Sequence, residues 1–280
     1  MARIVGIAGV THNPLMWSLL RADPPPDLDG AQARMAEVAD RMREARPDVL
    51  VVVASDHLHM QFTSNMPAFM VGKAPEMRAG FPSEKRTFGL PQATMTGHPG
   101  LSAHVLGGEE LASEFDFAFS DEPWLDHSFL VPLLLLTPAL DIPVVPVFTN
   151  ANSPPIPTAA RFAALGGHLR NVIDAYTGVE RVVVVGSGHF SHELGGPRQF
   201  LGVAPDPSFD DEAVGWMRDG DLAAATDRAT FARLTSAGNE SYQFLNFVTC
   251  LAAADGRGAG LAVAEETRFG GLPFLWWDGA

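Results

Sequence analysis

The chain has 280 residues, 46% of them hydrophobic and 19% charged, which is enough to bury a core and excludes disorder as its main state. The net charge of −14 argues against nucleic acid or an anionic membrane surface as a partner. A single cysteine, no apolar segment long enough to span a bilayer and no secretory signal at residues 1–6 lead us to expect a cytoplasmic protein.

The first part of the chain predicts a β-α-β unit. Residues 4–10 and 49–54 are short apolar runs typical of strands buried on both faces, and residues 31–46 carry apolar side chains at helical spacing. Two such strands form a parallel pair with a right-handed crossover by default. Residues 61–100 show no clear period, and we expect them to pass over the ligand-binding edge as a hairpin with loops.

The rest of the chain alternates helical and extended patterns. Helices are expected over 101–115, 128–136, 158–175, 210–220, 222–233 and 242–254. Pro132 is expected in the first turn of its helix. Strands are expected over 142–148, 181–185 and 261–267, the first of them at an edge or end of the sheet because of Pro143 and Pro146. With no repeat or linker, the sequence predicts one domain over residues 1–280, a three-layer α/β/α fold with a mostly parallel or mixed sheet.

Two histidines follow the first two predicted strands. His12 and His57 come just after buried apolar runs, and the carboxyl ends of strands in such a sheet converge on one ligand-binding crevice. Taken alone, a histidine in this position is more often a turn or packing residue than a metal ligand. Asp56 should point away from His57, whereas His59 is a competitor that faces the same way. We prefer His57 because it lies nearer the strand end.

A carboxylate and two more imidazoles complete the candidate site. Iron(II) held by two neutral histidines needs an anionic ligand, and Glu240 is the only carboxylate in its segment, with Gln243 nearby. The alternative is that Glu240 merely stabilises a helix N-terminus. His127 and His192 have ordinary pKa values near neutrality, as proton transfer at pH 7 requires. Their alternative is a solvent-exposed loop position.

The ordered set of motifs resembles the LigB-type class III extradiol ring-cleaving dioxygenases, whose type member is the β subunit of protocatechuate 4,5-dioxygenase. No single motif is specific, but their order along nearly the whole chain is. The motifs are Thr-His-Asn-Pro at 11–14, Ser-Asp-His at 55–57, Met-Pro-Ala-Phe at 66–69, Asp-His at 126–127 and Gly-His-Phe-Ser-His at 188–192.

The resemblance implies a single catalytic domain that uses Fe(II) and O2 to cleave a catechol-like, gallate-like or aminophenol-like ring. It implies that His12, His57 and Glu240 hold the iron. His192 is then the main acid/base residue, and His127 contacts the substrate hydroxyl and oxygen. Family members often carry Gly-Gly-Leu-Ser-His at 188–192, so the additional His189 leaves open which histidine acts. A homo-oligomer, or a complex with a small α subunit, is also expected.

Other interpretations stay open. The same His/His/Glu set around Zn²⁺ would make a hydrolase, and a relative with this fold could bind metal without catalysis. The complete set of five side chains argues against a non-catalytic relative. The aromatic residues and three basic residues outside these motifs each allow two interpretations. Residues 60–90 and the pair Trp276 and Trp277 either line an aromatic pocket or form core, and three basic residues either pair with a substrate carboxylate or are surface charges: Arg78, Lys85 and Arg86.

Overall fold

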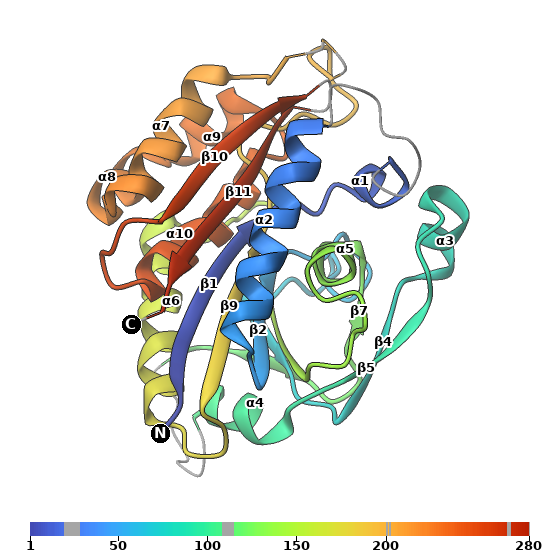
Figure 1. Cartoon of the computed structure of the whole chain (residues 1–280). Coiled ribbons are helices and arrows are strands. Elements are labelled where there is room, and N and C mark those ends of the chain that lie inside the picture. The colour runs from blue at the N-terminus through green and yellow to red at the C-terminus, as the bar shows by residue number, and fades with distance from the viewer. Residues whose placement is uncertain (20–28, 108–114, 200, 202, 268–269, 280) are drawn as a thin grey trace.

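A computed structural model describes residues 1–19, 29–107, 115–199, 201, 203–267 and 270–279 (Figure 1). These residues form an eight-stranded mixed sheet in the order β10-β11-β1-β9-β2-β8-β3-β6. Four parallel neighbours make its centre: β1 (Arg3–Val10), β9 (Arg181–Ser187), β2 (Val49–Ala54) and β8 (Val144–Thr149). Antiparallel pairing flanks them, with β3 (Phe69–Gly72) beside β8 and the pair β10 (Leu261–Thr267) and β11 (Gly270–Asp278) beside β1. The short β6 (Ala118–Ser120) lies at the other edge.

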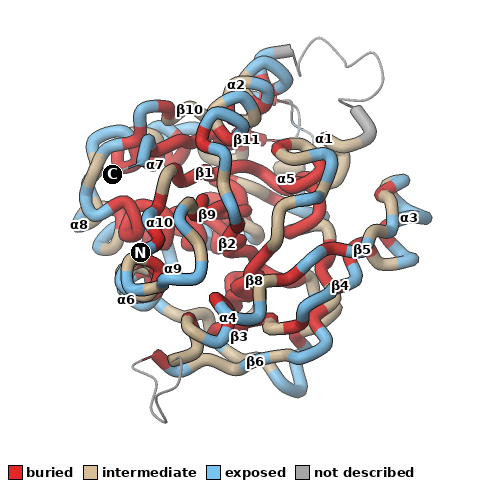
Figure 2. The backbone as a smooth tube through the Cα atoms, turned by 60° about the horizontal axis from the view of Figure 1, so that its bottom comes forward, coloured by how far each residue is buried: buried red, intermediate tan, exposed pale blue. Residues whose placement is uncertain are grey.

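Helices cover both faces of this sheet, which confirms the three-layer α/β/α fold (Figures 1 and 2). Strand β2 shows the cause, because Val51 faces one hydrophobic core and Val52 the other, and both are fully buried. The described α-helices with buried side chains in the first core are α4 (Pro99–Val105), α6 (Ala159–Ala175), α7 (Pro207–Asp219), α8 (Leu222–Arg228), α9 (Phe231–Ala237) and α10 (Leu245–Ala253). Those in the second core are α1 (Pro14–Leu19), α2 (Asp29–Ala45) and α5 (His127–Leu136). None of the described helices is long and apolar enough to cross a bilayer.

Residues 61–100, in which the sequence shows no clear period, contain the expected hairpin and, in addition, a strand of the main sheet. Strands β4 (Glu76–Ala79) and β5 (Ala93–Thr96) pair antiparallel around α3 (Pro82–Phe88), and β7 (Trp124–Leu125) joins β4 in a small second sheet. The addition is β3, which belongs to the main sheet. Helix α3 matters for the site because Phe88 lies on the pocket wall and Glu84 is buried against α5.

Several predicted boundaries are wrong, and proline explains two of them. Strand β8 is central, because Pro143 precedes it and Pro146 lies just outside the residues that pair with β3. Pro132 lies inside α5, which begins at His127. The remaining differences concern helix lengths and unpredicted elements, among them β6, β7 and β11. Helix α4 (Pro99–Val105) ends well before residue 115, where the predicted helix ended. Two separate helices, α8 and α9 (Phe231–Ala237), replace the single helix predicted over 222–233. A 3-10 turn, η2 (Ser241–Phe244), precedes α10, where the prediction had one continuous helix. Residues 108–114, where the 101–115 helix was expected to continue, lie outside the described residues.

Candidate active site

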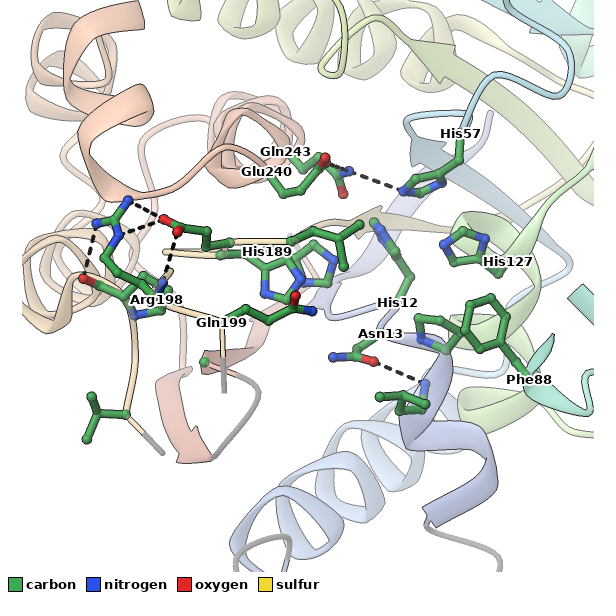
Figure 3. Close-up of a pocket in the computed structure, with 18 residues that line it drawn as sticks. His12, Asn13, His57, Phe88, His127, His189, Arg198, Gln199, Glu240 and Gln243 are labelled. Atoms are coloured by element: carbon green, nitrogen blue, oxygen red, sulfur yellow. Dashed lines mark hydrogen bonds and ion pairs between the residues drawn. The ribbon is translucent and has the colours of Figure 1, made fainter. Parts of the chain in front are cut away.

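Three adjacent parallel strands end at one pocket (Figure 3). His12 follows β1, His57 follows β2 and His189 follows β9, while His127 begins α5. The ring centroids of His12 and His57 are 5.2 Å apart, those of His57 and His127 4.1 Å, and those of His12 and His189 4.4 Å. The carboxyl ends of the strands therefore gather the imidazoles as the sequence analysis expected.

His192 and Glu240 also line this pocket, and their backbones are hydrogen-bonded to each other. The Glu240 N–H donates to the His192 carbonyl at 3.1 Å, and the His192 N–H donates to the Ser241 hydroxyl at 2.9 Å. Gly238 permits this close approach, because its φ is +150° and a Cβ there would lie 2.0 Å from the His192 carbonyl oxygen. The predicted carboxylate and the predicted acid/base residue are thus held as one unit.

The hydrogen bonds of His12 leave one ring nitrogen free. The Ser187 hydroxyl donates to the Ser128 carbonyl at 2.5 Å, so it accepts from His12 Nδ1 at 2.9 Å. His12 Nε2 then keeps its lone pair, and it is buried with no hydrogen-bond partner among the described residues. Burial, and next the positive charge that His189 and His57 would carry, hold the pKa of His12 well below its ordinary value. His12 is therefore neutral and suited to bind a metal.

His57 is oriented by a buried carboxylate. Asp126, the N-cap of α5, accepts from the His57 backbone N–H at 2.8 Å and from Nδ1 at 2.9 Å. Burial alone would lower the pKa of His57, but the hydrogen bond and charge of Asp126 outweigh it and the net shift is upward. Burial likewise opposes ionisation of Asp126, but the charge of His57 brings the pKa of that carboxyl below its ordinary value. With Nδ1 committed to Asp126, Nε2 is the nitrogen left for a metal.

His127 repeats this arrangement with a different carboxylate. Glu84 of α3 accepts from its backbone N–H and from Nδ1, both at 2.7 Å. Burial, and next the nearby His57, lower the pKa of His127 despite Glu84. One ring nitrogen from each of His12, His57 and His127 lies within 4.8 Å of the others. These three imidazoles are close enough to share one cation.

Glu240 reaches the cluster through Gln243. The Gln243 amide nitrogen lies 3.1 Å from Glu240 Oε2 and 3.3 Å from His57 Nε2, so the carboxylate and the imidazole converge on one point (Figure 3). Burial raises the pKa of Glu240, and His57 and Gln243 only partly oppose this. The imidazoles and the carboxylate fit a divalent cation that takes nitrogen and oxygen ligands. The candidates for a third ligand to such a cation are Glu240 and His127.

The structure decides several of the open alternatives on position alone. His57 lines the pocket, whereas the His59 ring packs against Phe81 with centroids 4.1 Å apart. Trp276 and Trp277 are core residues. His189, the additional imidazole, lies in the pocket and stacks on His192 at 4.2 Å. Three basic residues considered for substrate binding are exposed and do not line the pocket: Arg78, Lys85 and Arg86.

The residues that orient the histidines were not assigned a role from the sequence. Asp126 had a local signal, since it stands beside His127 at the start of a predicted helix. Ser187 had a weaker one, at the end of a predicted strand. Glu84 had none, because it lies 43 residues from its partner and the two meet only when α3 packs near α5.

Comparison with known proteins agrees with this architecture. The family model for the catalytic LigB subunit of aromatic ring-opening dioxygenase matches residues 6–272. Two 2,3-dihydroxyphenylpropionate/2,3-dihydroxicinnamic acid 1,2-dioxygenases are similar to this chain. The enzyme of Rhodococcus jostii strain RHA1 is 29% identical over 68% of this chain and 57% of its own length. The enzyme of a Rhodococcus species is 27% identical over 84% of this chain and 70% of its own length. The first match thus spans little more than half of the relative.

A solved structure shares the fold. The crystal structure of uncharacterized protein JW3007 from Escherichia coli K12 superposes with a TM-score of 0.62 over 97% of this chain and 99% of its own, at 17% sequence identity. This likeness supports the fold alone. The family match, which covers almost the whole chain, shows more: the chain belongs to the LigB family of aromatic ring-opening dioxygenase catalytic subunits.

Proposed function

We propose that this chain is a non-haem Fe(II)-dependent extradiol dioxygenase that cleaves a catechol-like ring with O2. The observation that carries the proposal is the buried, unpartnered Nε2 of His12 beside the nitrogens of His57 and His127. A lone pair in such a place loses water without gaining a hydrogen bond, which is unfavourable unless a cation binds it. Membership of the LigB family supports the reaction class.

Three residues would hold the metal: His12, His57 and Glu240. Two imidazoles and one carboxylate leave coordination positions open, which suits iron(II) in oxygenases. Bound iron would serve as a Lewis acid and template that brings the aromatic diol and O2 together. Ser187 and Asp126 fix the rings of His12 and His57, so both rings are already oriented with Nε2 toward the pocket.

Proton movement falls to the two remaining proposed histidines. Because Glu84 engages His127 Nδ1, the other nitrogen of this neutral ring is left to accept a hydrogen bond from a substrate hydroxyl. His192, whose ring stacks on His189 at 4.2 Å, is proposed as the main acid/base residue. Apolar side chains from Leu15, Phe88 and Leu194 form part of the pocket wall.

The names of the curated relatives support an ortho-dihydroxylated aromatic substrate, since they refer to 2,3-dihydroxyphenylpropionate and 2,3-dihydroxicinnamic acid. For this chain we propose a small aromatic diol, with gallate-like and aminophenol-like rings as further candidates. We also propose that it acts in the cytoplasm, as a homo-oligomer or with a small α subunit.

One observation favours a second candidate. The group of His12, His57 and His127 would suit tetrahedral zinc with a bound water, because three histidines plus water is a known hydrolytic arrangement. A hydrolase of this kind would need neither Glu240 as a ligand nor O2 as a substrate.

Anaerobic reconstitution with Fe(II) or Zn²⁺, followed by a screen of catechols, gallates and aminophenols in air, separates the two functions. We expect coloured ring-cleavage products and O2 consumption with iron alone. His192→Ala should keep its iron and lose about 10²- to 10⁴-fold in turnover, the usual contribution of a general acid or base. Full activity with zinc, or no product from any of these rings with iron, would refute the proposed function.

A further inference from the structure

An ion pair forms part of the pocket wall beyond the histidines. Arg198 lies on the side of the pocket away from His57 and His127 (Figure 3). Its Nε and Nη2 donate to Glu193 Oε2 at 2.6 and 2.5 Å, and its backbone N–H donates to Glu193 Oε1 at 3.1 Å. Glu193 is only 7% exposed, whereas the Arg198 side chain is 34% exposed, so the carboxylate is the buried partner of this pair.

The guanidinium has little capacity left for a ligand. Arg198 Nη1 donates to the Ser236 carbonyl at 2.8 Å and to the Pro205 carbonyl at 3.4 Å. Swinging Arg198 toward a substrate would break these bonds and leave Glu193 buried without its partner, which is strongly unfavourable. Among the lining residues that the structure describes, Arg198 is the only lysine or arginine.

Apart from the Gln199 amide, the other described side chains beside Arg198 on this wall offer no donor to an anion. Leu194, Val203 and Pro205 present apolar surface along this wall, and Glu193 itself is a carboxylate. A carboxylate on the substrate would lose its water here without gaining a free cation from the residues that the structure describes on this wall. A neutral substituent would bury apolar surface instead, which is favourable.

We propose that Glu193 sets the charge selectivity of this pocket. By occupying Arg198, it directs the site toward ortho-dihydroxylated rings with neutral, mainly apolar substituents, and against carboxylated ones. The inference rests on the proposed function and narrows its substrate class. It separates this chain from the curated relatives, whose names refer to a propionate and an acid.

The test compares 3-(2,3-dihydroxyphenyl)propionate with its primary amide, two catechols of the same size that differ in charge. Dissociation constants are measured by anaerobic calorimetry on the iron-loaded protein, and kcat/KM is measured in air. We expect the amide to be preferred by roughly tenfold or more in both measurements, because an unpaired buried charge costs at least that much. Equal affinity, or a preference for the propionate, would overturn the inference.

Glu193→Gln tests the assigned residue, since it removes the charge and keeps the shape. With Arg198 released from a carboxylate, the preference for the amide should shrink at least about tenfold or reverse. In the double variant Glu193→Gln/Arg198→Met, which has no guanidinium to bind the propionate, the preference for the amide should return. Glu265→Gln is the matched control, because Glu265 pairs with Arg34 outside the pocket. Removing the charge of Glu265 should leave the ratio of amide to propionate affinity unchanged.

The outcomes separate the two proposals. If both catechols are cleaved but the propionate is preferred, only the charge selectivity is wrong. An unchanged ratio in a folded Glu193→Gln variant would remove Glu193 from its role. If neither compound binds or reacts, both proposals fail.

Discussion

Each histidine of the cluster is fixed through the same ring nitrogen. Nδ1 of His12, His57 and His127 contacts Ser187, Asp126 and Glu84 respectively, at 2.9, 2.9 and 2.7 Å. Because Nδ1 is engaged in all three, Nε2 is the atom that each ring presents. This common orientation is what a metal site requires, because the three rings need not turn when a metal binds.

Substitution of the proposed ligands should remove the metal. His12→Ala, His57→Ala and Glu240→Ala should each lower Fe(II) affinity by more than the roughly 10- to 100-fold expected for losing a group that only orients a ligand. His127→Ala should keep iron and lose turnover. Iron content, measured anaerobically on folded protein, checks this. If His127→Ala loses iron while Glu240→Ala retains it, the three-histidine set is correct instead.

The positions of site residues could be predicted where a residue directly follows a strand that the sequence identifies. His12 and His57 follow apolar runs, so the parallel arrangement of β1 and β2 brings them to one edge. Glu84 could not be predicted, because nothing local to α3 indicates that it will meet His127. The pairing of Glu193 with Arg198 depends in the same way on how one irregular segment folds back.

At the level of elements, a proline inside α5 connects the helix to the site. Pro132 has no N–H, so the Ser128 carbonyl one turn earlier lacks its helical donor. The Ser187 hydroxyl at the end of β9 supplies that donor at 2.5 Å, and this leaves its oxygen to accept from His12. The missing helical hydrogen bond therefore determines which nitrogen of His12 carries the proton.

Ser187→Ala should weaken the metal site without removing a ligand. His12 Nδ1 would lose its acceptor and the Ser128 carbonyl its donor, so Fe(II) affinity should fall about 10- to 100-fold. Competition with a chelator under anaerobic conditions measures this. Ser102→Ala is the control, since Ser102 is equally buried, lies in α4 and makes no side-chain hydrogen bond within the described structure. An unchanged affinity in Ser187→Ala would mean that His12 is held by packing alone.

The elements themselves were predictable where periodicity was strong. The buried runs of β1, β2 and β9 and the helical spacing of α2 and α6 identified these elements within a few residues. Strand β11 was not predicted, because its Gly270, Gly271 and Pro273 are typical of turns. Its strand conformation depends on pairing with β1 and β10, which no local pattern reveals.

At the scale of the whole molecule, Asp210 joins three distant parts of the chain. It lies on α7 and accepts from the Ser191 N–H at 2.7 Å and from the Ser191 hydroxyl at 3.0 Å, next to His192. Gly271 of β11 makes room for it, because a Cβ there would lie 2.1 Å from Asp210 Oδ2. The segment that carries His192 is thus tied to a helix and to the strand pair that extends the sheet.

This buried carboxyl should make stability depend on pH. Burial raises the pKa of Asp210 from 3.8 to about 7; the Ser191 hydrogen bonds oppose the shift, and the charges of Asp206 and Asp211 add to it. Between these two values the folded protein holds a proton that the unfolded chain has released. Raising the pH through this window therefore favours unfolding, by an amount on the order of 4 kcal/mol at most.

Asp210→Asn removes this ionisation and keeps a side chain that can hydrogen-bond Ser191 in both positions, since the hydroxyl can also accept. We expect the variant to gain stability relative to the wild-type protein as the pH rises from about 4 to 7, with little further change above about 8. Chemical denaturation of both proteins across this range measures the difference in the free energy of unfolding, in which other titrating groups cancel. A difference that stays constant with pH would show that Asp210 is already ionised in the fold, and that the two Ser191 hydrogen bonds outweigh its burial.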